Sequence, residues 1–206
     1  MSEERTSKER MSTYEATVSR TTKETSIEIS LDLFGSGVTE IETGIPFFDH
    51  MLDAFGRHAT FDLRVKAQGD LDVDAHHCVE DVGLVLGTAF AQALGDKKGI
   101  TRFGDACVPM DEALVLAAID ISGRGQCHYN VEVPFEFIGT FETSLAHEFW
   151  IAFASTAGIS LHIYELDGRN SHHIIEASFK AVARALRIAV ALDPRIDGVP
   201  STKGAL

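Results

Sequence analysis

One short motif occurs twice in the sequence, and the spacing of its copies constrains the fold more than any other feature. "AHHCVE", residues 75–80, and "SHHIIE", residues 171–176, each place two adjacent histidines shortly before a glutamate. The copies are 96 residues apart, counted from His76 to His172. Neighbouring residues on a helix point about 100° apart, so the two histidines of one copy do not easily bind the same metal ion.

Similar predicted elements surround both copies of the motif. Alternation of apolar and polar residues predicts strands, and apolar residues at helical spacing predict helices. The first copy has predicted strands 26–35, 37–43 and 61–67 and predicted helices 45–58 and 76–95. The second copy has predicted strands 113–123, 126–133 and 159–166 and predicted helices 141–156 and 172–190. We therefore predict an α/β fold of the α+β type, a tandem duplication of a β-β-α-β-α unit whose sheet is covered on one face by helices.

The predicted domain organisation follows from this repeat. Residues 1–12 are polar and mixed in charge and read as a loose N-terminal tail. Residues 13–110 form the first half-repeat and residues 111–206 the second, together one compact catalytic domain. A chain of 206 residues is long enough to bury a sizeable core in this way.

Charge and cysteine content exclude several classes of function. A net charge of −13 repels nucleic acid and anionic membranes, and no apolar run approaches the length of a membrane span. An anionic substrate would therefore need a local cluster of Arg and Lys. Cys78, Cys107 and Cys127 are odd in number and widely spaced, which argues against a disulfide framework and favours a reducing cytoplasm.

The doublets favour a metal site. Histidine and carboxylate without cysteine suit Mn²⁺, Fe²⁺ or Zn²⁺. A single histidine near a helix start is more often a cap or a surface residue, but two doublets in register, with His50 on the preceding helix, favour metal ligation. One doublet supplies too few ligands, so two symmetric motifs suggest two ions, each with ligands from both halves.

Phosphate binding is indicated more weakly. The Gly-bounded loop 95–105 carries Arg102, the turn 122–126 carries Arg124, and the segment 198–206 carries Ser201 and Lys203. Each basic residue taken alone is more often a solvated surface charge. The sequence has no P-loop, no G-x-G-x-x-G and no G-x-S-x-G motif, so nucleotide binding and serine hydrolase chemistry have no support.

Seven segments together resemble the imidazoleglycerol-phosphate dehydratase family of histidine biosynthesis. They are "TGIPFFDHML", "AHHCVED", "KKGITRFGD", "MDEAL", "ISGRG", "GRNSHHIIEASFKAVARALR" and "PSTKGAL". The resemblance runs from about Arg20 to Leu206. It implies a duplicated α/β fold, a homo-oligomer of 24 subunits with active sites at the interfaces, and two Mn²⁺ ions per active site.

The resemblance also implies the site residues. The metal-ligand positions fall on His50, His76, His77, Glu80, His172, His173 and Glu176. The substrate contacts fall on Glu24, Arg102, Arg124, Lys180, Ser201 and Lys203. The candidate catalytic carboxylates are Glu24, Glu80 and Glu176, with Glu24 favoured for an acid/base role and an exposed strand carboxylate as the alternative for it.

The implied reaction is the dehydration of D-erythro-imidazole glycerol phosphate to imidazole acetol phosphate. No carbonyl acidifies the hydrogen that is lost, so we expect metal ions on the imidazole nitrogens to stabilise the imidazolate, which then expels the hydroxyl. Two alternatives remain at this point: a dinuclear metallohydrolase of a small phosphorylated substrate, and a non-catalytic metal-binding shell. A hydrolase would release free phosphate, and a shell would turn over nothing.

One segment, "SLAHEFW", departs from one form of the family pattern. In that form a helix carries Glu-His-Phe, and its histidine is a ligand that mirrors His50. Here the order is His147-Glu148-Phe149, and ungapped alignment from the downstream doublet places Glu148 at the ligand position. Because a carboxylate is an acceptable donor for Mn²⁺, we predict that Glu148 faces the site and that His147 is a surface residue.

Overall fold

The first four strands form one mixed sheet. The computed structural model describes residues 14–204 and residue 206, so the predicted tail lies outside the described residues. The strands of this sheet lie in the order β1-β2-β4-β3, with only the β3–β4 pair parallel. They are β1 (Glu15–Thr21), β2 (Thr25–Asp32), β3 (Thr39–Glu42) and β4 (Asp62–Gly69). Ile27, Ile29 and Leu31 alternate along β2 and are buried, as the sequence pattern predicts.

A second sheet repeats this topology. Its order is β5-β6-β10-β7, again with only the last pair parallel. The strands are β5 (Phe103–Met110), β6 (Ala113–Asp120), β7 (Gln126–Asn130) and β10 (Ser160–Asp167). A two-stranded hairpin, β8 (Phe137–Ile138) and β9 (Phe141–Glu142), follows β7.

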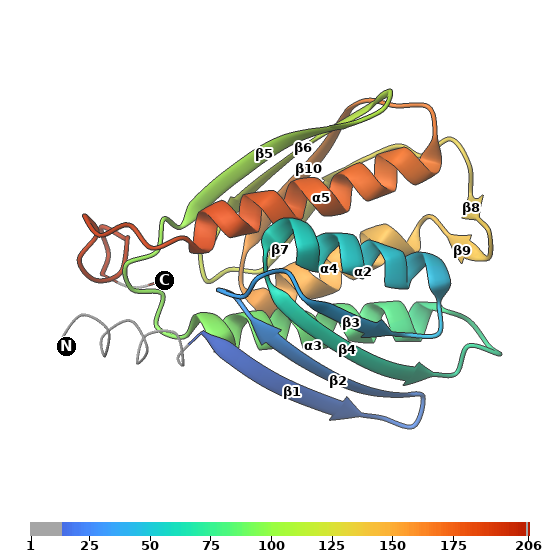
Figure 1. The fold of residues 1–206 in the computed structure, drawn as a ribbon, viewed down its shortest axis with the longest axis horizontal. Coiled ribbons are helices and arrows are strands. Elements are labelled where there is room, and N and C mark those ends of the chain that lie inside the picture. The colour runs from blue at the N-terminus through green and yellow to red at the C-terminus, as the bar shows by residue number, and fades with distance from the viewer. Residues whose placement is uncertain (1–13, 205) are drawn as a thin grey trace.

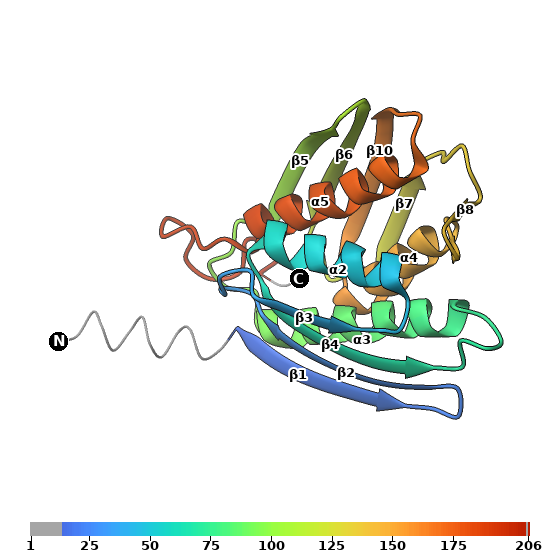
Figure 2. The ribbon, with the colours of Figure 1, turned by 45° about the vertical axis from the view of Figure 1, so that its right-hand side comes forward.

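The helices lie in a layer between the two sheets (Figures 1 and 2). In the described part of the chain they are α2 (Pro46–Ala59), α3 (His76–Leu94), α4 (Leu145–Ala157) and α5 (Ser171–Val190). α3 packs on α4 and on the first sheet, whereas α5 packs on α2 and on the second sheet. Each sheet is therefore covered by helices on one face, as predicted.

Small residues bring α3 and α4 close together. A Cβ atom added at Gly87 would clash with the Thr156 hydroxyl and the Phe153 carbonyl, and one added at Gly83 would clash with Ala152. The Thr156 hydroxyl uses this proximity to donate a hydrogen bond of 2.8 Å to the Leu84 carbonyl. The two half-repeats therefore contact each other at short backbone-to-backbone distances along α3 and α4.

The α/β class and the duplication are confirmed, but the repeating unit has one strand more than predicted. β1 and β5 were not predicted, so the unit is β-β-β-α-β-α and the molecule has two main sheets instead of one. Both extra strands lie at sheet edges, where β1 is mostly exposed and β5 is half exposed, and neither shows a strong apolar alternation in the sequence. The boundary predicted between residues 110 and 111 falls in the turn that joins β5 to β6.

The offset between the halves changes along the chain. β5 starts 88 residues after β1 (103 − 15), whereas the doublets are 96 apart (172 − 76). Residues 131–144, with the β8–β9 hairpin, replace a connection of three residues, 43–45, and so add 11 residues to the second half (14 − 3). The offset at the doublets is smaller than this addition predicts because later connections of the second half are shorter, as with 168–170 in place of 70–75. α2 and α4 each end at a residue with a left-handed backbone conformation, and these residues, Thr60 and Gly158, are 98 positions apart (158 − 60).

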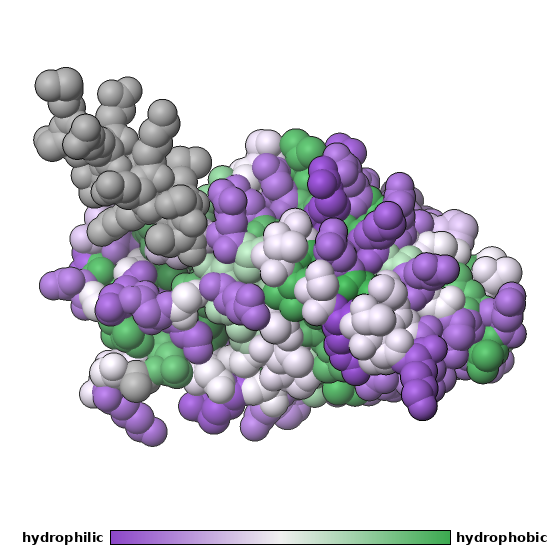
Figure 3. Space-filling view, turned by 90° about the horizontal axis from the view of Figure 1, so that it is seen from below, coloured by the Kyte–Doolittle hydropathy of each residue, from purple (hydrophilic) through white to green (hydrophobic). Residues whose placement is uncertain are grey.

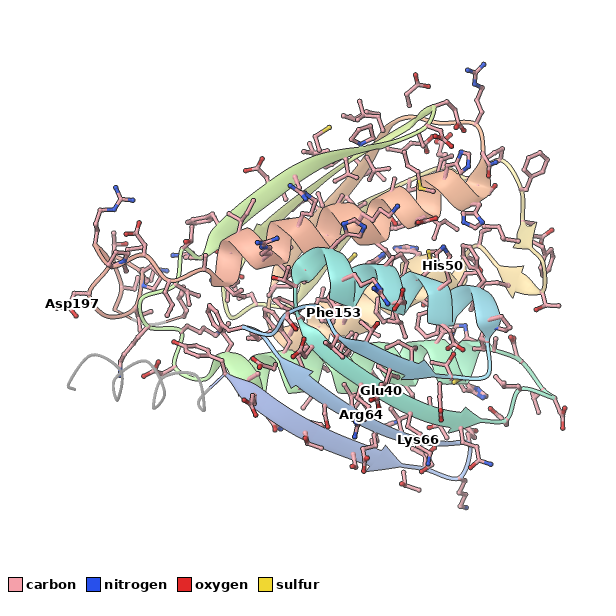
Figure 4. All side chains as sticks on the ribbon, in the orientation of Figure 1. Glu40, His50, Arg64, Lys66, Phe153 and Asp197 are labelled. Carbon is pink, nitrogen blue, oxygen red and sulfur yellow. The ribbon has the colours of Figure 1, made fainter. Side chains whose placement is uncertain are left out.

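The side of the molecule on which β1 lies is mostly hydrophilic, with hydrophobic side chains scattered among polar ones (Figure 3). Glu40 of β3 and Arg64 of β4 are register partners there and form an ion pair of 2.7 Å (Figure 4). This polar face suits a sheet surface in contact with water.

Within the described residues, none of the helices combines the length and the apolar composition that a membrane span requires.

Candidate active site

The predicted metal ligands lie at one end of the molecule. α2, α3, α4 and α5 all begin at the right-hand end in Figure 1, where both histidine doublets lie at helix starts. α5 begins where it does because the Asn170 side chain accepts a hydrogen bond of 3.0 Å from the His172 backbone N–H. We call this region the histidine end.

Three predicted ligands converge there within one chain. His50 of α2 joins His172 and Glu176 of α5, with one potential ligand atom from each lying within 4.8 Å of the others. His172 Nε2 is 3.0 Å and His50 Nε2 is 3.3 Å from Glu176 Oε2. Figure 4 labels His50 beside α5, toward the histidine end. This is the only such group of metal-binding side chains among the described residues.

Glu176 is the centre of this cluster. It is only 6% exposed, and Lys180 Nζ bonds to its second carboxylate oxygen at 2.8 Å. Burial raises the pKa of the Glu176 carboxyl, but the hydrogen bond and charge of Lys180, followed by the charge of His50, outweigh burial and lower the pKa. The carboxylate is therefore ionised and able to accept bonds from both histidines or to ligate a cation.

The doublets diverge as predicted. The rings of His76 and His77 lie 6.3 Å apart at 87° to each other, and those of His172 and His173 lie 6.1 Å apart at 77°. In each doublet the first histidine approaches the glutamate four residues later: His76 Nε2 lies 3.9 Å from Glu80 Oε2. The second histidine of each doublet contacts other carboxylates.

His77 contacts two carboxylates from loops. Its Nδ1 lies 3.2 Å from Asp70 Oδ2 and 3.9 Å from Glu24 Oε2. The hydrogen bond with Asp70, followed by the charge of Glu24, raises the pKa of His77. Glu24 lies in the β1–β2 turn and its side chain is 58% exposed, so it is accessible at the histidine end.

His173 has one close carboxylate partner, Glu112, in the β5–β6 turn. His173 Nδ1 lies 2.7 Å from Glu112 Oε2. The hydrogen bond from His173, with further bonds from backbone N–H groups, lowers the pKa of Glu112 to about 2. Because an ionised carboxylate only accepts hydrogen bonds, the proton in this contact belongs to His173 Nδ1.

The predicted phosphate contacts lie at the opposite end, where α5 ends and the C-terminal segment begins. The Arg102 backbone N–H donates a bond of 2.8 Å to the Ala189 carbonyl. Ala189 follows His172 by 17 residues (189 − 172), which is about 26 Å along a helix. A small phosphorylated imidazole cannot reach from His172 to Arg102 within one chain. We call this region the basic end.

Arg102 is already paired. Its guanidinium donates to both oxygens of Asp120, at 2.7 and 3.2 Å, and to the Pro200 carbonyl at 2.8 Å. Arg124 and Lys203, two further predicted contacts at this end, have exposed side chains. Ser201 Oγ accepts a hydrogen bond of 3.2 Å from the Lys203 backbone N–H. The fourth predicted basic contact, Lys180, instead lies beside Glu176 at the histidine end.

Glu148 and His147 lie in the first turn of α4 and are both half-buried. The His147 ring stacks on the Tyr129 ring of β7 with centroids 4.8 Å apart, so it is packed against the second sheet instead of lying free on the surface. With the offset of 98 taken from the ends of α2 and α4, the counterpart of His50 is Glu148 (50 + 98). Glu148 remains a prediction as a ligand.

Sequence reasoning missed the carboxylates that contact the second histidine of each doublet. Asp70 lies in the short connection that leads into α3, seven residues before His77, where no periodicity marks it. Glu112 carried a signal, because its motif "MDEAL" contributes to the family resemblance. The offset of 88 would also have matched it with Glu24 (24 + 88), but the sequence pattern did not reveal that offset.

Sequence comparisons agree with the geometry. The family model described as imidazoleglycerol-phosphate dehydratase matches residues 43–186. An imidazoleglycerol-phosphate dehydratase of Acidiphilium cryptum is 59% identical over 194 residues, which cover 93% of this chain and 98% of that protein. One of Acidothermus cellulolyticus is 58% identical over 192 residues and covers 93% of both chains.

Solved structures also match. The crystal structure of imidazoleglycerol-phosphate dehydratase from Staphylococcus aureus superposes with a TM-score of 0.80 at 38% identity, covering 87% of this chain and 99% of that chain. The enzyme from Pyrococcus furiosus, solved in complex with (S)-C348, has a TM-score of 0.80 at 40% identity, covering 92% and 100%. The chain belongs to the imidazoleglycerol-phosphate dehydratase family and is a hydro-lyase that dehydrates imidazoleglycerol phosphate in histidine biosynthesis.

Proposed function

We propose that the dehydration takes place at a centre of two Mn²⁺ ions held by the doublets and their glutamates. The observation that carries this proposal is the convergence of His50, His172 and Glu176. Imidazole nitrogen with an ionised carboxylate is a donor set that suits Mn²⁺, and three donors leave positions for ligands from elsewhere. The proposed ligands are His50, His76, His77, Glu80, Glu148, His172, His173 and Glu176.

The protein residues have distinct proposed roles around this centre. When bound, the metal ions supply Lewis acidity to the imidazole ring of the substrate. Glu176 holds His172 in place through a contact of 3.0 Å within α5, and Glu80 lies beside His76 within α3. Lys180 keeps Glu176 ionised in its buried position and contributes a positive charge to the substrate side of the cluster.

Glu24 is the proposed acid/base residue that moves the proton from the carbon next to the departing hydroxyl. Its side chain is exposed and lies at the histidine end, 3.9 Å from His77. A general base must lie within reach of the proton that it moves, and an exposed carboxylate beside the imidazole-binding groups meets this condition. The product of this loss of water is imidazole acetol phosphate.

The proposed phosphate contacts are Arg102, Arg124, Ser201 and Lys203. Arg124 and Lys203 are exposed and supply the positive charge, whereas Arg102 pairs with Asp120 and holds the C-terminal segment through Pro200. Charge-assisted contacts of this kind contribute about 1.5–3 kcal/mol each. The net charge of −13 makes such a local basic cluster necessary for an anionic substrate.

The distance between the two ends supports a homo-oligomer with active sites between subunits. The histidine end and the basic end are about 26 Å apart along α5, so both can contact one small substrate only if they come from different copies. We propose 24 subunits, as the family resemblance implies. We also propose a cytoplasmic location, which the three free cysteines suit, and no binding of nucleic acid or membranes.

Mixing inactive variants tests the shared site. We expect His172→Ala and Lys203→Ala each to lose most of its activity as a pure assembly. Dissociated together and reassembled in equal amounts, they should regain about a quarter of wild-type activity. A shared site is active only if its histidine end and its basic end are both intact, and each is intact with a probability of about one half. If both ends acted within one chain, this mixture would stay inactive.

A second mixture is the matched control. Wild-type protein reassembled with an equal amount of the double variant His172→Ala/Lys203→Ala should retain about a quarter of the activity if sites are shared, but about a half if they are not. The metal is tested separately, by following product formation after chelation and after addition of Mn²⁺. Full activity of metal-free protein would refute the Mn²⁺ centre.

A further inference from the structure

Both doublets place a carboxylate against Nδ1 of their second histidine. Asp70 Oδ2 lies 3.2 Å from His77 Nδ1, and Glu112 Oε2 lies 2.7 Å from His173 Nδ1. Neither carboxylate belongs to the doublet motif: Asp70 lies in the connection that leads into α3, whereas Glu112 lies in the β5–β6 turn, which the fold brings to the start of α5. The contact at His173 is the shorter of the two and has a single close partner.

Glu112 is itself held in place. Its Oε1 accepts hydrogen bonds from the backbone N–H groups of Arg169, at 3.3 Å, and Asn170, at 2.9 Å. These residues immediately precede α5, so Glu112 ties the β5–β6 turn to the start of the helix that carries His173. With one oxygen fixed by the backbone, the other faces His173 in a defined orientation, and the side chain is only 28% exposed.

We propose that Glu112 is a positioning residue that keeps the proton of neutral His173 on Nδ1 and leaves Nε2 free as a metal donor. This inference rests on the proposed function, which makes His173 a metal ligand. A ligating histidine commonly donates its other ring N–H to a carboxylate, which fixes both the tautomer and the ring orientation. Glu112 thus acts on the metal site through His173, without touching the substrate.

The duplication gives Glu112 a counterpart in the first half. The β1–β2 and β5–β6 turns are related by the strand offset of 88 residues, which makes Glu24 the counterpart of Glu112 (24 + 88). In the first half Asp70 takes the close contact with the histidine, and Glu24 stands 3.9 Å away. Glu24 therefore stays available for the substrate, whereas Glu112 is committed to His173. The two equivalent turn positions therefore have different proposed roles.

Replacing Glu112 by glutamine provides a sharp test, because an amide has only one acceptor oxygen. The backbone N–H groups of Arg169 and Asn170 both need that oxygen, so the amide NH₂ must face His173. A donor in this position favours an unprotonated Nδ1. We expect Glu112→Gln to invert the tautomer and to put the proton on Nε2, the nitrogen that would bind the metal.

Asp111→Asn is the matched control. It removes one negative charge from the same turn, but Asp111 Oδ2 lies 3.6 Å from His173 Nε2, beyond a hydrogen bond, and the side chain is 77% exposed. Asp111 has a left-handed backbone with φ of 47°, which asparagine tolerates. An effect of charge alone would therefore appear equally in both variants.

Neutron diffraction of the metal-free protein at alkaline pH locates the deuterium atoms on His173. We expect deuterium on Nδ1 in the wild type and in Asp111→Asn, and on Nε2 in Glu112→Gln. Calorimetric titration should then show Mn²⁺ binding about 10- to 100-fold weaker in Glu112→Gln and unchanged in Asp111→Asn. A role confined to stabilising the start of α5 would lower stability without inverting the tautomer.

Deuterium on Nε2 in the wild type would overturn the inference, even if Glu112→Gln failed to fold. An unchanged tautomer in a folded Glu112→Gln would overturn it as well. If the wild type bound no Mn²⁺, the proposed metal centre would fail, whereas the deuterium positions would still decide whether Glu112 sets the tautomer. The two failures are therefore distinguishable.

Discussion

Glu176 connects more functional groups than any other residue of the histidine end. His50, His172 and Lys180 all contact its carboxylate, although they come from two helices. Removing a single histidine leaves the buried carboxylate with Lys180, so the fold should persist while the donor set is lost. Variants of the histidines around Glu176 therefore separate effects on metal binding from effects on the stability of the fold.

We predict that His172→Ala loses Mn²⁺ binding and most of its activity. The change removes one of three convergent donors, which lowers the affinity of the site for the metal ion and leaves its coordination geometry less well fixed. His128→Ala is the control, because His128 stacks on His162 on the second sheet and lies outside the convergent cluster. Metal content and turnover should be measured on both variants. Near-normal turnover of His172→Ala with bound metal would contradict the prediction.

Asp62 gives a pH dependence that is independent of the metal site. Its Oδ1 accepts hydrogen bonds of 2.8 Å from the backbone N–H groups of both Ser36 and Val38. Burial raises the pKa of Asp62, but the backbone bonds from Val38 and Ser36 outweigh burial and lower it below 3.8. A lowered pKa in the folded state means that the carboxylate stabilises the fold above its unfolded pKa.

We predict that this stabilisation is lost as the pH falls below 3.8 toward the lower folded pKa of Asp62. Asp62→Asn should be less stable than the wild type above this window, and the difference should shrink as the pH falls through it. Asp72→Asn, a change at an exposed carboxylate, serves as the control. Denaturant unfolding at a series of pH values measures the difference, and a constant difference would rule out the assignment.

At the scale of elements, the helices determine how the two halves join. Val79, Val82, Leu86 and Phe90 form the buried stripe of α3, and Gly83 and Gly87 let the backbone of α4 approach. The β8–β9 hairpin lengthens only the second half and changes the number of residues between α2 and α4. By the offset of 98 at the helix ends, Glu148 is the sequence counterpart of His50.

We predict that Gly87→Ala destabilises the protein. The added methyl group gains up to about 1 kcal/mol of helix propensity, but it clashes with Thr156 and with the Phe153 carbonyl. Overpacking of this kind typically costs about 1–3 kcal/mol, and backbone atoms yield little. Gln92→Ala, at an exposed position of the same helix, is the control. The free energy of unfolding should fall only for Gly87→Ala, and a more stable Gly87→Ala would show that α3 and α4 can move apart.

At the scale of the whole molecule, the two ends of the helix layer carry different chemistry. The histidine end gathers imidazoles and carboxylates at the helix starts. At the basic end, Arg102 bonds to the Pro200 carbonyl of the C-terminal segment that carries Lys203, and Gly123, next to Arg124, lies against Leu206. Figure 4 shows this separation through its labels: His50 lies toward the histidine end, and Asp197 of the C-terminal segment lies at the other. A shared site therefore links catalysis to assembly.

We predict that metal removal weakens the assembly. If ions take ligands from more than one subunit, their binding free energy contributes to the contact between subunits. Sedimentation velocity should show smaller species after chelation and recovery of the large species after Mn²⁺ is restored. The control is His128→Ala, which should behave like the wild type. An unchanged sedimentation profile in metal-free protein, or a fully active monomer, would contradict the prediction.

Local patterns in the sequence determined much of this fold. The periodicity of apolar residues located the four described helices and the central strands, because it reports which faces of one element are buried. The repeated doublets established the duplication and marked His76, His77, His172 and His173 as a related set. Their divergence followed from helix geometry alone.

Only the tertiary structure decided which of these groups meet. The edge strands β1 and β5 are each paired only with the strand that follows them in the chain, so their place depends on that pairing and not on a strong apolar pattern of their own. His50 joins the second doublet because α2 packs on α5, a contact that no local spacing encodes. Glu112 reaches His173 across 61 residues, and Arg102 lies far from His172 because Arg102 contacts the end of α5 whereas His172 lies at its start. Long-range burial, which couples all elements at once, fixes these positions.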